Sequence, residues 1–176
     1  MSYPTYTVGT TGITFASGKS MLALFNGAGS GRIVRVYRIF ILNNQTATVT
    51  GVLTTFEIRK ISSLSGGTSL TFVKHDSNNE TPPAQIVAAT GGTTSPVSGQ
   101  VFRRLVWSND EPAVGTGTWD EFETIPVLSC VWDAGYGEAD VQPITLREGE
   151  GLEVAHTGTT TVGYVDMYFE ITVSTS

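Results

Sequence analysis

The sequence has few of the residues on which most chemistry depends. Cys130 is the only cysteine, which excludes an intramolecular disulfide, and the two histidines are too few for an ordinary zinc site. Charged residues make up only 15%, and the net charge of -6 argues against a nucleic-acid-binding surface. A long apolar run that could span a bilayer is missing, and residues 1–5 lack the layout of a signal peptide. We therefore expect synthesis in a reducing cytoplasm, no metal or cofactor, and neither nucleic acid nor membrane as a partner.

The chain is rich in residues that favour extended structure. It contains 20 glycines and many threonines, valines and isoleucines, a composition typical of pleated strands rather than helices. Residues 163–173 alternate almost strictly between apolar and polar side chains, which predicts a half-buried strand. Similar but shorter patterns elsewhere predict about ten strands, spaced as a sandwich requires. The expected fold class is an all-β, antiparallel β-sandwich.

The patterns also predict how the chain is divided. Residues 1–20 hold short apolar-polar stretches separated by glycine and threonine, so we expect an N-terminal arm or edge strands there. Residues 21–176 are expected to form a single β-sandwich domain, since a chain of this length can bury one sizeable core.

Two pairs of neighbouring strands are expected to be joined by tight turns. Residues 32–42 and 49–61 flank a short polar turn and are expected to form a hairpin. Residues 144–146 and 152–154 flank a glycine-containing turn, where two short strands should meet.

Three kinds of segment could carry chemistry. Residues 26–31 are glycine-rich like a phosphate-binding loop, but a β-branched strand follows instead of a helix, which favours a connecting turn. Carboxylates gather in residues 119–123 and 148–153, as a glycoside hydrolase would need, although exposed strands also carry acids for solubility. Residues 133–140 could surround a calcium ion but lack the regular ligand spacing.

Cys130 lies in a strand pattern, where a thiol is usually a small buried side chain. We expect no catalytic residues and no enzyme.

The arginines require partners wherever they become buried. Arg32, Arg35 and Arg38 share one expected strand, and Arg103 and Arg104 share another. An unpaired guanidinium is costly to bury, so each arginine needs a carboxylate. The partner can belong to the same chain or to another subunit, where the planar fork of arginine is favoured. The sequence leaves both alternatives open.

Several stretches, together with the final strand, carry a likeness to a known group of proteins. They are residues 26–36 (NGAGSGRIVRV), 42–45 (LNNQ), 49–51 (VTG), 66–68 (GGT) and 143–151 (PITLREGEG). In strand order and turn texture the chain resembles small β-sandwich virion proteins of tailed bacteriophages, among them the jelly-roll head decoration or cement proteins. This resemblance implies a jelly-roll-like, non-enzymatic protein, made in the host cytoplasm, that assembles as a homo-oligomer on the capsid exterior. Trimers are favoured, and the major capsid protein is the implied partner.

The residues expected at subunit contacts come from the arm, the arginine-bearing strands and the long loops. They are Tyr3, Tyr6, Phe15, Arg35, Arg38, Arg103, Arg104, Trp107 and Trp119. The alternative function is a carbohydrate- or receptor-binding β-sandwich module of a phage or cell surface. Its basis is that loop aromatics such as Trp107, Trp119 and Tyr136 could stack on sugar rings.

Overall fold

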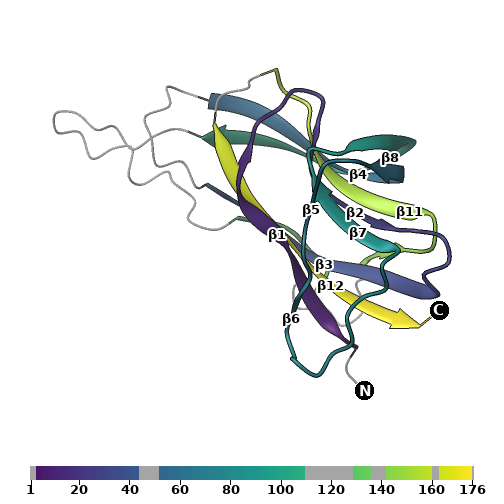
Figure 1. The fold of residues 1–176 in the computed structure, drawn as a ribbon. Coiled ribbons are helices and arrows are strands. Elements are labelled where there is room, and N and C mark those ends of the chain that lie inside the picture. The colour runs from purple at the N-terminus through teal and green to yellow at the C-terminus, as the bar shows by residue number, and fades with distance from the viewer. Residues whose placement is uncertain (1–2, 44–51, 110–128, 136–141, 160–162, 176) are drawn as a thin grey trace.

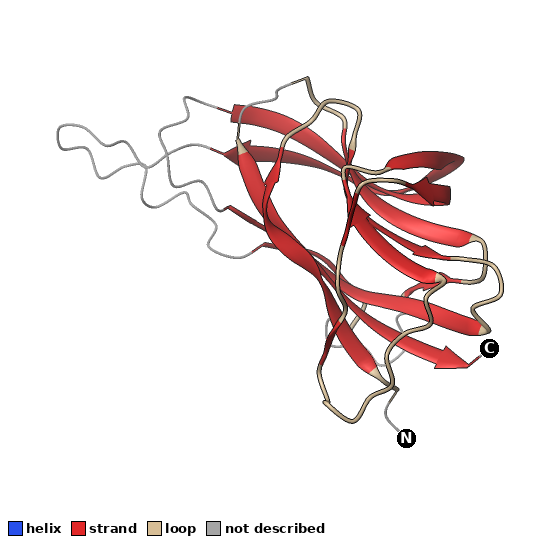
Figure 2. Ribbon diagram, in the orientation of Figure 1, coloured by secondary structure: helices blue, strands red, loops and turns tan. Residues whose placement is uncertain are grey.

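The protein is a sandwich of two antiparallel sheets. The computed structural model describes residues 3–43, 52–109, 129–135, 142–159 and 163–175. In these residues the regular structure is entirely β, and the strands form two six-stranded sheets that pack face to face (Figures 1 and 2). The described residues contain no helix long and apolar enough to cross a bilayer. The expected all-β sandwich is confirmed, with twelve described strands rather than about ten.

The first sheet, sheet A, is built around the C-terminal strand. Its members are β1 (Thr5–Thr14), β3 (Arg32–Asn43), β6 (Val73–Lys74), β9 (Ser129–Asp133), β10 (Ile144–Leu146) and β12 (Tyr164–Thr175). The order is β10-β3-β12-β1-β6, and β9 also pairs with β3. The alternation expected for β12 is confirmed, since Val165, Met167 and Phe169 are buried while the side chains between them are only partly covered.

The second sheet, sheet B, ends in a long strand. Its members are β2 (Ser20–Asn26), β4 (Val52–Ser65), β5 (Thr68–Ser69), β7 (Ile86–Thr90), β8 (Thr93–Asn109) and β11 (Glu150–His156). The order is β5-β7-β2-β11-β4-β8, so that β8 is a terminal strand that pairs only with β4 in the described part of the chain.

The connections cross repeatedly from one sheet to the other. The partial orders β1-β12-β3-β10 and β2-β11-β4-β8 are those of a jelly roll, which confirms the expected topology. The expected hairpin of β3 with β4 was wrong, because β3 lies in sheet A and β4 in sheet B. The expected pairing at the glycine turn was wrong for the same reason, since β10 and β11 belong to different sheets. A turn signal shows that a chain reverses, but not whether the next strand stays in the same sheet.

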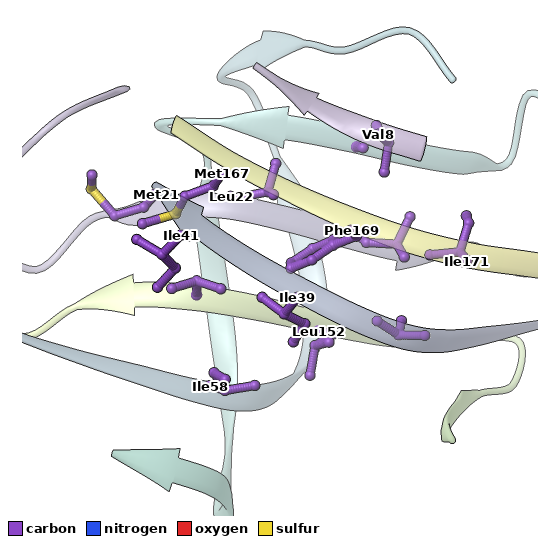
Figure 3. Packing of buried hydrophobic residues seen from close by; sticks show 14 of the residues in the cluster. Val8, Met21, Leu22, Ile39, Ile41, Ile58, Leu152, Met167, Phe169 and Ile171 are labelled. Atoms are coloured by element: carbon purple, nitrogen blue, oxygen red, sulfur yellow. The ribbon is translucent and has the colours of Figure 1, made fainter. Parts of the chain in front are cut away.

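A single core fills the space between the sheets (Figure 3). Sheet A contributes Val8, Ile39, Ile41, Met167, Phe169 and Ile171, and sheet B contributes Leu22, Ile58 and Leu152. Part of the expected arm belongs to this core, because β1 pairs with β12 and buries Tyr6 almost completely. Phe15, which follows β1, is equally buried.

Candidate interaction surfaces

The glycine-rich loop between β2 and β3 encloses a carboxylate of the same chain. The backbone N–H groups of Gly31 and Gly29 donate hydrogen bonds to the Glu148 carboxylate at 2.6 and 3.2 Å. Both glycines have positive φ, which allows neighbouring N–H groups to converge on one anion. These two hydrogen bonds hold the pKa of Glu148 below its ordinary value. The loop is a connecting turn, as expected, and Glu148 fastens it.

The acids of residues 148–153 point to separate surroundings. Glu150 forms an ion pair of 3.0 Å with the ammonium group of Lys60, which lies in β4. Glu148 is bound instead by the loop between β2 and β3. Glu153 is fully buried and accepts a hydrogen bond of 2.8 Å from Arg59 Nε. The carboxylates of a glycosidase must flank the same bond of the substrate. Each of these three acids is instead engaged by a different partner.

Several residues singled out from the sequence lie outside the described residues. They include Trp119 with the rest of residues 119–123, and Tyr136 within the expected calcium segment. The described start of that segment is Asp133, which accepts a hydrogen bond from the Gly135 N–H. In the described part of the chain, no group of three or more His, Cys, Asp or Glu side chains could hold a metal ion.

Arg38 bridges two carboxylates on the outer face of sheet A. Its Nε donates to Asp133 and its Nη1 to Glu170, both at 3.2 Å. These hydrogen bonds, the one to Asp133 first, raise the pKa of Arg38. Of the two alternatives left open by the sequence, pairing within the chain applies to this arginine.

A shallow groove of about 350 Å³ surrounds the Arg38 cluster. Tyr37 and His75 line it beside Arg38, Asp133 and Glu170. An aromatic ring next to hydrogen-bonding charged groups is suited to a polar ring-shaped ligand.

A second contact on sheet A involves Tyr3 and Arg35. The Arg35 guanidinium carbon lies 5.5 Å from the centroid of the Tyr3 ring, and Arg35 Nη1 donates to Ser174 Oγ at 2.6 Å. Tyr3 is more than half exposed. Tyr3, Arg35 and Arg38 are thus three of the expected contact residues that lie at the surface.

Three other expected contact residues are buried. Phe15 stacks on the His156 ring with 5.4 Å between ring centroids, and Trp107 packs against Phe56 at 6.3 Å. Together with Tyr6 they belong to the core, so they offer no surface for another subunit. The burial of Trp107 also removes it as a platform for sugars. The direction of an apolar side chain depends on which sheet its strand joins, and the local pattern does not contain that information.

Strand β8 exposes apolar side chains along the side of the sandwich. The exposed fractions are 39% for Val101, 37% for Phe102 and 71% for Val106. These three account for half of the six large exposed hydrophobic residues in the described chain. Monomeric proteins usually protect a terminal strand by charge, shortness or a covering segment, so exposed apolar residues on such a long strand indicate a contact surface.

The two arginines of β8 lie among these apolar residues. Arg104 Nε forms an ion pair with Glu57 at 2.8 Å. Arg103 Nη1 donates to the Val131 carbonyl at 2.6 Å, and its guanidinium lies 5.4 Å from the centroid of the Trp132 ring. No carboxylate of the described residues forms an ion pair with Arg103. We call Val101, Phe102, Arg103, Arg104 and Val106 the β8 edge.

Comparisons with models of protein families, with curated proteins and with solved structures give no significant match. What this chain does must be argued from its own residues.

The sequence pointed to the arginines of the β8 edge but not to its apolar members. The segment from Val101 to Trp107 shows neither the two-residue period of a half-buried strand nor the helical period, because it has apolar residues on both faces. A strand of that kind lies either inside a sheet or at a contact. Cys130 on the adjacent strand β9 was also misjudged, because its thiol is exposed rather than buried.

Proposed function

We propose that this protein is a structural virion component that assembles as a homo-oligomer, most readily a trimer, on the outside of a bacteriophage head. There it binds the major capsid protein and stabilises the shell, without a catalytic role. The jelly-roll strand order and the resemblance of the sequence support the class of protein. The β8 edge carries the proposal, because a long terminal strand with exposed apolar side chains requires a partner.

Stabilisation of a shell by such a protein follows from mass action. A protein that binds the assembled shell but not its separated subunits shifts the equilibrium towards the shell. An oligomer that contacts several shell subunits at once gains effective concentration from each contact, so that single contacts of modest affinity suffice. An oligomer of sandwiches that expose contact surfaces on their sides can reach several shell subunits at once.

Co-sedimentation with phage heads that lack this protein tests the proposal. The wild-type chain should pellet with the heads, and electron cryo-microscopy of the particles should show it at symmetric positions. Val106→Asp should reduce the bound fraction because it places a charge on the β8 edge. Val87→Asp is the matched control, since Val87 is an exposed valine on the outer face of β7. A chain that stays monomeric and never sediments with heads contradicts the proposal.

A carbohydrate- or receptor-binding module is the second candidate, and the groove around Arg38 is the observation that favours it. Tyr37 could stack on a sugar ring there while Asp133 and Glu170 accept hydrogen bonds from hydroxyl groups. On a glycan array, Tyr37→Ala should abolish binding in the groove, and Trp119→Ala tests the loop proposed from the sequence. An array without hits for the wild-type chain removes this candidate.

A further inference from the structure

Apolar side chains line two opposite sides of the sandwich. On one side β8 faces β9, where the rings of Phe102 and Trp132 are 5.9 Å apart. On the other side a groove between the sheets is lined by Ile13 of β1 and by Leu70 next to β5. Strand β6 continues sheet A beyond β1 on this second side, so it is well separated from β8 (Figure 1).

The side that contains β6 exposes an apolar side chain and two carboxylates, and the Lys74 side chain of β6 is partly buried. Val73 of β6 is 62% exposed, and the loop that follows carries Asp76 and Glu80, both exposed. The Glu80 side chain is 84% exposed, and its ion pair with Arg32 is long, at 3.5 Å. A second cation can therefore approach the Glu80 carboxylate from solvent. We call Val73, Asp76 and Glu80 the β6 edge.

We propose that the β8 edge of one copy docks on the β6 edge of the next copy. This inference rests on the proposed function, because it specifies the contact of the homo-oligomer. Both surfaces carry an exposed valine. The β8 edge has Arg103, which pairs with no carboxylate of the described residues, whereas Arg104 already pairs with Glu57. The β6 edge has the exposed carboxylates Asp76 and Glu80, which outnumber the partly buried Lys74 of β6. Each strand is also terminal in its sheet, so that one row of its backbone groups faces outward in the described structure.

Charge decides between this contact and a symmetric one. Two β8 edges that met across a two-fold axis would bring Arg103 and Arg104 of both copies together, and Arg103 has no ion pair with a carboxylate of the described residues to offset its charge. Facing the β6 edge, the same guanidinium meets a carboxylate with which it can form a forked hydrogen-bonded pair. A contact between two different surfaces on opposite sides is head-to-tail, and it closes into a ring when the rotation permits. A trimer is such a ring.

The oligomeric mass of the full chain and its variants tests the contact. By native mass spectrometry and sedimentation velocity, the wild-type chain should be oligomeric, whereas Val106→Asp and Val73→Asp should each be monomeric. Val87→Asp should keep the wild-type mass. Far-ultraviolet circular dichroism checks that every variant is folded, which is expected because all three valines are exposed.

Mixing the two monomeric variants distinguishes a head-to-tail contact from a symmetric one. In the mixture, the intact β8 edge of Val73→Asp can bind the intact β6 edge of Val106→Asp, and each partner has lost its other surface. The expected product is therefore a heterodimer with one copy of each variant and nothing larger. A Val73→Asp chain with wild-type mass, or a mixture that stays monomeric, overturns the inference.

Charge reversal tests the paired arginine and glutamate directly. Arg103→Glu and Glu80→Arg should each weaken self-association by about tenfold or more, since each creates a like-charge pair. The double variant should recover most of the loss. If the double variant is no better than the single ones, the two residues do not meet.

Failure of this inference and failure of the proposed function give different results. An oligomer that resists Val106→Asp and Val73→Asp overturns the contact but leaves the virion proposal standing. A monomeric wild-type chain overturns the contact as well, and co-sedimentation with heads then decides separately on the virion proposal.

Discussion

At the scale of single residues, His156 is a titratable group that the fold encloses completely. Its side chain is fully buried, stacks on Phe15 and shares a hydrogen bond between Nε2 and Thr54 Oγ1. Burial lowers the pKa of His156, because the charged imidazolium would lose its hydration. The folded protein therefore accommodates the neutral ring.

Stability should fall as the pH drops through the range in which His156 titrates. The unfolded chain takes up a proton near the ordinary value of 6.5, and the folded chain does so only at lower pH. The free energy of unfolding therefore decreases below pH 6.5, by up to about 1.4 kcal/mol per pH unit, until the folded pKa is reached. Urea unfolding between pH 5 and 7 should show this slope in the wild type and lose it in His156→Phe, which preserves the ring stack. A variant with the wild-type slope contradicts this origin.

Glu148 affects stability in the same direction as His156, but in a more acidic range. Because its folded pKa is lowered, the stability it confers is present above the ordinary value of 4.5 and disappears as the pH falls through the folded pKa. Glu148→Gln should lower the melting temperature at pH 7, and the difference should shrink in acid. Differential scanning calorimetry measures it, with Glu80→Gln as a control because Glu80 is similarly exposed but has no contact with the loop glycines. Equal effects of the two changes would exclude the loop as the cause.

At the scale of elements, a buried carboxylate connects three strands of sheet B. Glu153 of β11 accepts hydrogen bonds from Arg59 of β4 at 2.8 Å and from Thr94 of β8 at 2.9 Å. Glu57 of β4 then binds both Arg59 and Arg104. The central strands are therefore linked to the terminal strand by side chains as well as by the sheet ladder.

Removing the cation from this network should destabilise the sheet. Arg59→Met leaves the buried Glu153 carboxylate without its charged partner, at a cost of about 3 kcal/mol. The double variant Arg59→Met/Glu153→Met should recover much of this loss, since an apolar pair can replace a buried ion pair. Urea denaturation of both variants measures the two values. A double variant as unstable as the sum of the two single ones would show that packing, rather than charge, holds the strands.

The strands could be predicted from the sequence more reliably than their partners. The alternation that defines β12 is a local property, and the buried positions of Val165 and Met167 follow from it. The pairing of β3 is not a local property, because its partner β12 is the last strand of the sequence and is separated from β3 by most of the chain. The same limit applies to the site: Glu170 and Asp133, which bind Arg38, lie 132 and 95 residues away from it. No spacing rule connects residues at such separations.

At the scale of the whole molecule, both sheets contribute to one core and should unfold together. Phe169 lies near the middle of this core and is fully buried (Figure 3). Phe169→Ala should lower the free energy of unfolding by about 3–5 kcal/mol because it leaves a cavity between the sheets. Circular dichroism and tryptophan fluorescence should still report one coincident transition in urea. Two separate transitions would mean that the sheets are independent units.

The exposed valines of β8 have a consequence before any oligomer forms. An uncovered terminal strand is a template on which further strands can add without limit, the growth mode of fibrous aggregates. Arg103 and Arg104 oppose such growth, because stacked copies would place guanidinium groups of one sign on top of one another. Repulsion thus helps to keep newly synthesised chains apart, and concentrated salt, which screens that repulsion, should favour precipitation of the isolated protein.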